Sequence, residues 1–228
     1  MGCKRRENAT RSGVHRQRVH CRGGARARLT DEVLQLAGDG LLDAIAQHAP
    51  DAAGLAEQCV AALHERAWEG DEELADQLVA ILNQGPTPML RPLPVDLEQL
   101  ASLMESDPVW GGGRIDLKTG DCWPQSSGYE GYEVYEDDSL DEDGGRWLDV
   151  ECIGSGAGYR DMELFIATVD DPAIADRLQI AISGKGAFRR FKDVLSRWPD
   201  ELHRYFLFCS ERQVGRARAW LAAAGYTP

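Results

Sequence analysis

The chain has 228 residues and a formal net charge of −13, and its 43% hydrophobic and 28% charged residues are ordinary for a globular protein. Its longest uncharged run, residues 77–90, holds two prolines and is shorter than the roughly 18 apolar residues that a membrane span needs. We therefore expect no membrane span and no membrane partner, and the acidic balance disfavours nonspecific nucleic-acid binding by the folded part.

Residues 1–28 form a basic segment that we interpret as a disordered tail. It holds nine Arg or Lys and one acid, a local charge of +8, which leaves −21 for the rest of the chain. It has no hydrophobic periodicity and little to bury. Two alternatives are a basic arm for nucleic acid and a zinc site, although the zinc-ligand types present fit no common finger spacing: Cys3, His15, His20 and Cys21.

Residues 29–83 have apolar side chains at helical spacing and predict a bundle of three short helices. Gly38 and Gly40 interrupt the first pattern, and Asp51 and Asp71 mark the starts of the second and third. The next segment, 84–94, holds four prolines and predicts a linker.

Residues 95–228 predict an α+β domain. Asp96 and Gln99 resemble a capping box at the start of a helix. The hydrophobic period then changes to that of strands, which short loops join into an antiparallel sheet, with candidates at 114–118, 122–123, 132–135 and 147–153. From Tyr159 the pattern is helical again, with a helix start at Asp171-Pro172, another at 184–195 and a last helix that ends before Gly225.

The predicted fold class is therefore α+β, in which a helical N-terminal part precedes a small antiparallel β-sheet packed with C-terminal helices. Four segments within residues 95–228 resemble a bacterial group known as uncharacterised protein family 0158 of the UPF series. They are RIDLKTGDCW (114–123), YRDMELFIATV (159–169), GKGAFRRFKDVL (184–195) and ARAWLAAAGYTP (217–228). The resemblance implies that residues 95–228 are one evolutionary unit, and it supplies no catalytic residues because the family has no assigned activity.

The stretch GKGAFRRFKDVL combines a predicted helix start with a cluster of cations. Phe188, Phe191 and Leu195 are spaced to face the core, which leaves the basic side chains to project elsewhere. Backbone N–H groups at a helix start, reinforced by such cations, bind anions. We expect an anion-binding or partner-binding site formed by Lys185, Arg189, Arg190, Lys192 and Arg197.

The run 133–143 has seven acids in eleven residues and predicts a solvated loop. It partly resembles an EF-hand calcium loop, and the weaker hypothesis is a divalent-cation site at Asp137, Asp141 and Asp143. Gly154, Gly156 and Gly158 lie between a strand and a helix, but the preceding strands lack the βαβ context of a dinucleotide site. No cofactor is expected.

Several aromatic residues gather on or near the predicted sheet: Trp123, Tyr129, Tyr132, Tyr135 and Trp147. We expect them to form core beneath the helices, and the alternative is a surface that stacks single-stranded bases. The histidines after the basic segment, His48, His64 and His203, are expected on the surface.

Six scattered cysteines without a CxxC pair, and no apolar run after the basic start, favour a cytoplasmic protein. The lack of a recognisable catalytic motif favours a non-enzymatic interaction or regulatory protein with an acidic or phosphate-bearing partner. The alternatives are a nucleic-acid-associated protein that uses the basic tail and the 185–197 helix, and a metal-assisted phosphate hydrolase that uses the acidic loop.

Overall fold

The structure is a computed structural model that describes residues 33–85, 89–105, 111–125 and 145–228. The elements follow in the order α1 (Leu34–Ala46), α2 (Ala52–Arg66), α3 (Asp71–Ile81), β1 (Arg91–Pro92), α4 (Leu97–Met104), β2 (Gly113–Asp116), β3 (Cys122–Pro124), β4 (Trp147–Val150), α5 (Ser155–Ile166), α6 (Pro172–Ala181), α7 (Ala187–Leu195), α8 (Pro199–Ala223) and β5 (Tyr226–Thr227). The fold is α+β, as the sequence predicts.

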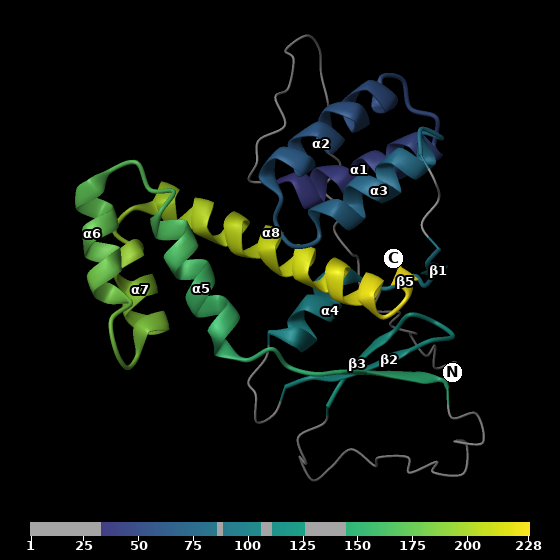
Figure 1. Cartoon of the computed structure of the whole chain (residues 1–228). Coiled ribbons are helices and arrows are strands. Elements are labelled where there is room, and N and C mark those ends of the chain that lie inside the picture. Colours follow the sequence, from purple (N-terminus) through teal and green to yellow (C-terminus); the bar gives the residue numbers. More distant parts are fainter. Residues whose placement is uncertain (1–32, 86–88, 106–110, 126–144) are drawn as a thin grey trace, which may run out of the picture.

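The long helix α8 runs through the molecule and joins its parts (Figure 1). The α1–α3 bundle lies on one side of it, and α4 and the sheet lie on the other. Helices α5, α6 and α7 lie beside its N-terminal half, where Tyr205 and Phe208 enter their apolar cluster. Ala217 and Leu221, near its other end, belong to the cluster formed with α4 and the sheet.

The bundle α1–α3 has its own apolar core, built from residues at helical spacing such as Leu34, Leu63 and Leu74. The expected interruption at Gly38 and Gly40 does not occur, because α1 continues through both. A Cβ atom at Gly38 would lie 2.5 Å from Cδ2 of Leu74, so this glycine allows α1 and α3 to pack closely.

The three-stranded sheet is antiparallel with strand order β3-β2-β4, and Ile115 pairs with Cys122 on one side and Leu148 on the other. Ile115 and Val150 are buried in the same cluster as α4 and α8. One face of the sheet is thus covered by helices, as alternating strands predict. The candidate strand 132–135 lies outside the described residues.

Several predicted helix ends are confirmed. The Asp96 carboxylate accepts hydrogen bonds from the backbone N–H groups of Glu98 and Gln99, at 2.9 and 3.1 Å, and so caps α4. Asp171 caps α6 in the same way, with a bond of 2.8 Å from the Ala173 N–H. Gly225 follows α8 with φ of +91°, a conformation that glycine adopts without strain.

Part of the proline-rich segment 84–94 is integrated into the fold. Strand β1 pairs in parallel with β5 next to the end of α8, and Leu93 is buried in the core. The parallel pair joins residues that are far apart in the chain, a contact that no local pattern reveals. Within the residues described, no helix is both long and apolar enough to cross a membrane.

Candidate functional site

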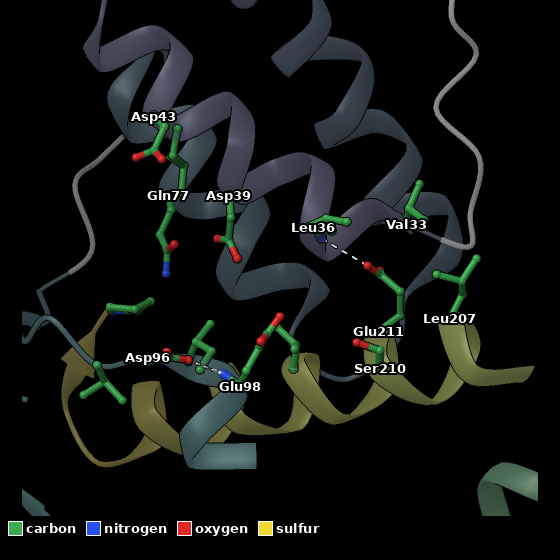
Figure 2. A pocket seen from close by; sticks show the side chains of 15 residues that line it. Val33, Leu36, Asp39, Asp43, Gln77, Asp96, Glu98, Leu207, Ser210 and Glu211 are labelled. Atoms are coloured by element: carbon green, nitrogen blue, oxygen red, sulfur yellow. Dashed lines mark hydrogen bonds between the residues drawn. The ribbon is translucent and has the colours of Figure 1, made fainter. Parts of the chain in front are cut away.

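A groove of about 490 Å³ opens between the N-terminal bundle, the start of α4 and the middle of α8 (Figure 2). We call it the acidic groove, because five carboxylates line it: Asp39, Asp43, Asp96, Glu98 and Glu211. They come from α1, α4 and α8 and from the residue that caps α4, so only the folded chain brings them together.

The carboxylate of Glu211 on α8 caps the N-terminal end of α1. Its Oε2 accepts a hydrogen bond from the backbone N–H of Gln35 at 2.7 Å, and its Oε1 accepts one from the N–H of Leu36 at 3.0 Å. The N-cap residue of α1, Val33, provides no side-chain bond, so this carboxylate supplies the cap from another element. Burial raises the pKa of Glu211, although these donors and Arg66 oppose the shift.

Arg66 extends this contact into a buried ionic network. Its Nη1 lies 3.0 Å from Oε2 of Glu211, and its Nη2 lies 2.6 Å from Oδ1 of Asp71. Asp71 also accepts hydrogen bonds from the side chain of Gln35 and the backbone N–H of Trp68, both at 2.9 Å. Buried charges are tolerated only when paired and hydrogen-bonded, and these are.

Arg218 is fully buried and fixes two residues of the groove wall. Its Nη2 donates to Oδ1 of Asp39 at 2.6 Å, and its Nη1 donates to Oε1 of Gln77 at 2.9 Å. Its Nε donates to Oε1 of Gln35 at 2.9 Å, which connects the groove wall to the network around Glu211. The side chains of Asp39 and Gln77 are therefore held in place before any ligand arrives.

The amide nitrogen of Gln77 is buried and has no acceptor among the described residues. Because Oε1 of the same amide accepts from Arg218, the two amide atoms cannot be exchanged without placing one donor against another. A buried donor without a partner costs about 1–3 kcal/mol. The Gln77 amide thus has one unused hydrogen bond at the wall of the groove.

The groove has more negative than positive charge. Asp39 pairs with Arg218, and Asp96 caps α4. Asp43 and Glu98 are exposed, and among the described residues their carboxylates have no hydrogen-bonding or ionic partner. Two carboxylates at the groove are therefore free to attract a cation.

Apolar side chains lie between these charges. Leu36 on α1 is 67% exposed although it borders the groove. Other apolar lining residues are Val33, Leu42, Val95, Leu97, Leu207 and Val214. The groove therefore combines an apolar surface with fixed and free carboxylates, which is suited to a ligand that has both apolar and cationic groups.

Most of the predicted cationic cluster is exposed on or beside α7. Arg189 and Lys192 are three residues apart on α7 and so share one side of the helix, and the exposed Lys185 lies in the turn that precedes it. Arg189 makes only a 3.8 Å ion pair with Asp193, and Arg197 is also exposed. These four side chains remain a predicted anion-binding or partner-binding surface.

Arg190 differs from the other members of this cluster. Its Nε donates to the carbonyl of Ala181 at 3.1 Å, and its other nitrogens bond to the carbonyls of Ser183, Gly184 and Lys185. These groups end α6 and form the turn into α7, so the guanidinium holds the end of one helix against the next. Arg190 thus has a structural role in this turn, and its role as an anion ligand stays a prediction.

The prediction that Phe188 faces the core is also wrong, since the structure leaves it 39% exposed. Helix α7 buries Ala187, Phe191 and Leu195, which are spaced by four residues, against α6 and α8. Phe188 lies at the edge of this stripe, next to Gly158. Spacing alone favoured Phe188 because i+3 and i+4 neighbours are both on the same side of a helix.

The sheet aromatics that the structure describes are not core. Trp123 is 54% exposed, and Trp147 has the guanidinium groups of Arg114 and Arg146 at 4.2 and 4.9 Å from its ring centroid. They lie on the sheet face opposite the helices, because they pair with Arg114 and Asp116 rather than with Ile115. The histidines 48, 64 and 203 are exposed, as expected.

Some predictions fall outside the described residues. They are the basic tail 1–28 with its zinc alternative, the acidic run 133–143 and the metal hypothesis at Asp137, Asp141 and Asp143. In the part of the chain that the structure describes, no group of His, Cys, Asp or Glu side chains is arranged to hold a metal ion.

Gly154 precedes α5 and follows an antiparallel strand, so the glycine-rich segment is a connection between β4 and α5.

The acidic groove could not be predicted from the sequence pattern, because its residues are far apart in the chain. One signal was available on α8, where Glu211 and Arg218 share a side with Val214 and Leu221 at i, i+3 and i+7 spacing. Charges within an apolar stripe indicate buried pairs. Their partners on α1–α3, such as Asp39, had no such signal.

Comparisons with known proteins give no relative: no family model, curated protein or solved structure matches the chain. The resemblance of residues 95–228 to uncharacterised protein family 0158 therefore stays a prediction, and function has to be inferred from the geometry.

Proposed function

We propose that this protein is a cytoplasmic, non-enzymatic interaction protein and that the acidic groove is its docking surface. The observation that supports this most is the coexistence of free carboxylates on Asp43 and Glu98 with the exposed Leu36 in one cavity. The volume of the groove, about 490 Å³, falls within the usual range of binding pockets, about 300–1,000 Å³.

The groove is prepared for binding before a partner arrives. Arg218 fixes Asp39 and Gln77, and backbone donors fix Asp96. Fixed groups lose little conformational freedom when a ligand binds, so more of the interaction energy contributes to affinity. Carboxylates held by hydrogen bonds attract cations through electrostatic complementarity, and this favours recognition as the role of the site.

The cytoplasmic part of the proposal is supported by the cysteines. The four that the structure describes, Cys59, Cys122, Cys152 and Cys209, are all free thiols. Burial raises the pKa of Cys59 and of Cys209 to about 11, which keeps both thiols protonated and unreactive. Unpaired structural thiols are typical of a reducing compartment.

The test is proximity cross-linking of the full-length chain in cells, with partners identified by mass spectrometry. The groove variant is Asp43→Lys with Glu98→Lys, and the control is Glu163→Lys with Asp176→Lys, which makes the same charge change at exposed acids on α5 and α6. We expect the groove variant to lose partners that the wild type and the control retain. Identical partner sets for the two variants would refute docking at the groove.

A second candidate is a nucleic-acid-associated protein, favoured by the exposed cations on and beside α7, Lys185, Arg189 and Lys192. Phosphate contacts of this kind make affinity fall steeply with salt. Gel-shift assays with single-stranded RNA and duplex DNA would compare the wild type with Arg189→Glu and Lys192→Glu. Binding that is absent at low salt, or unchanged in these variants, excludes this function for α7.

A further inference from the structure

The charges of the acidic groove select a cationic occupant. Asp43 and Glu98 are unpaired among the described residues, and the Asp39 side chain stays 44% exposed even while it bonds to Arg218. Figure 2 shows Asp39 and Asp43 on one wall and Asp96 and Glu98 on the other. Carboxylates on two walls of a cleft focus negative potential in the space between them.

The apolar lining excludes a purely hydrophilic cation. Leu36, Val95 and Val214 lie in the same cavity as the carboxylates. A small hydrated ion leaves these surfaces uncovered, and among the described residues no cluster is arranged to hold a metal. Lysine and arginine side chains fit better, because an apolar stem carries their charge.

Gln77 adds a requirement for a hydrogen-bond acceptor. Its buried Nε2 has no acceptor among the described residues, while Arg218 holds the oxygen of the same amide. In Figure 2 the amide of Gln77 extends from α3 toward the space between the two walls. Simple polyamines have no acceptor for this N–H when protonated, whereas each peptide unit has a carbonyl oxygen.

From these three features we propose that the acidic groove binds an extended polypeptide segment in which lysine or arginine alternates with apolar residues. The basic side chains pair with Asp43 and Glu98, the apolar ones cover Leu36, and a main-chain carbonyl accepts from Gln77. The inference rests on the proposed function and names the partner class of the same site.

The first test uses fluorescence anisotropy with the full chain and two labelled synthetic peptides, one of alternating leucine and lysine and one of alternating leucine and glutamate. We expect the lysine peptide to bind about tenfold more tightly. Asp43→Lys with Glu98→Lys should reverse this preference, and Glu163→Lys with Asp176→Lys should leave it unchanged. Equal binding of the two peptides to the wild type, or no binding of either, overturns the proposal.

Gln77→Glu separates carbonyl recognition from charge attraction. The new carboxylate still accepts from Arg218, but it removes the donor and adds a negative charge. If a peptide carbonyl binds Gln77, the lysine peptide should bind about fivefold more weakly despite the added charge. Tighter binding to this variant would overturn the proposal, provided that circular dichroism shows it is folded.

The outcomes also separate this inference from the proposed function. Cross-linked partners that depend on the groove, combined with no preference for the lysine peptide, would contradict the inference and leave docking at the groove standing. Partners that do not depend on the groove would contradict the proposed function itself. Self-association in sedimentation experiments without peptide, abolished by Asp43→Lys with Glu98→Lys, would identify a second copy as the occupant and overturn the inference.

Discussion

Glu211 accepts a 2.7 Å hydrogen bond from the backbone N–H of Gln35, across a separation of 176 residues. Through this bond a carboxylate in the middle of α8 caps the first turn of α1 and anchors the N-terminal bundle to the rest of the protein. Together with the bond from Arg218 to Asp39, this contact joins α8 to α1 at the wall of the acidic groove.

Glu211→Gln should lower the free energy of unfolding by about 3 kcal/mol, because it leaves Arg66 with one fewer buried countercharge and places an amide donor among donors. Urea unfolding followed by circular dichroism measures the change. Glu201→Gln on the same helix is the control, since its partly exposed ion pair with Arg204 contributes about 0–1 kcal/mol. Equal losses in the two variants would contradict the anchoring role of Glu211.

Gly215→Ala should destabilise the protein, whereas Gly40→Ala should stabilise it. A Cβ at Gly215 would lie 2.2 Å from the carbonyl oxygen of Glu69, so α8 would have to move away, at a cost of about 3 kcal/mol. A Cβ at Gly40 in α1 meets nothing within 4 Å, and alanine there should contribute about 0.5–1 kcal/mol. Thermal unfolding of both variants tests this, and similar melting temperatures would count against the close approach of α8.

Arg190→Gln and Arg189→Gln should have opposite signatures. Loss of Arg190 frees the carbonyls at the end of α6 and should cost about 1–2 kcal/mol, measured by urea unfolding. Arg189 is exposed, and its removal should change stability by less than about 0.5 kcal/mol. If Arg189→Gln proved the more destabilising change, the structural role of Arg190 would be wrong.

Arg146→Gln should raise the pKa of Asp116. A hydrogen bond from Arg146, 2.6 Å from Oδ2, holds the pKa of this buried carboxyl below its usual value of 3.8. Since the folded-state pKa is the lower one, the ion pair adds stability above pH 3.8, and this is lost as the pH falls through the folded-state value.

Carbon-13 NMR titration of the Asp116 carboxyl measures the shift directly, with Arg160→Gln as a control at an exposed arginine on α5. The wild type and the control should titrate at the same pH, below the Arg146→Gln variant. An Asp116 carboxyl that titrates identically in all three proteins would show that the ion pair is absent in solution.

The local pattern of the sequence was sufficient for most elements. Asp96 and Asp171 mark helix starts because a short carboxylate bonds to the N–H groups two or three residues on, and this needs no tertiary contact. The antiparallel pairing of β2 with β3 was predictable, since short connections favour antiparallel neighbours. The pairing of β2 with β4 was not, because these strands are far apart in the chain. The parallel pair of β1 with β5 was not, because it joins the two ends of the domain.

The basic residues on and beside α7 are exposed, as the sequence predicts, but residue type could not assign a role to each of them. Arg189 and Arg190 are neighbours with the same chemistry, but only Arg190 reaches the carbonyls of the turn at 183–185, while Arg189 is exposed with a 3.8 Å ion pair to Asp193. Similarly, the pattern identified Phe191 as core but could not exclude Phe188, which the packing of α6 and α8 leaves at the edge.

Composition and neighbours within one or two turns were enough to predict most helices, the strands β2, β3 and β4, the α+β class and the excess of negative charge. They did not predict β1 and β5, which depend on pairing with each other. Where the negative charge acts depends on how the helices pack. Asp39, Glu98 and Glu211 form one groove only because α8 carries Glu211 and Arg218 into contact with the bundle, and such contacts depend on chain closure over distances that no local period encodes.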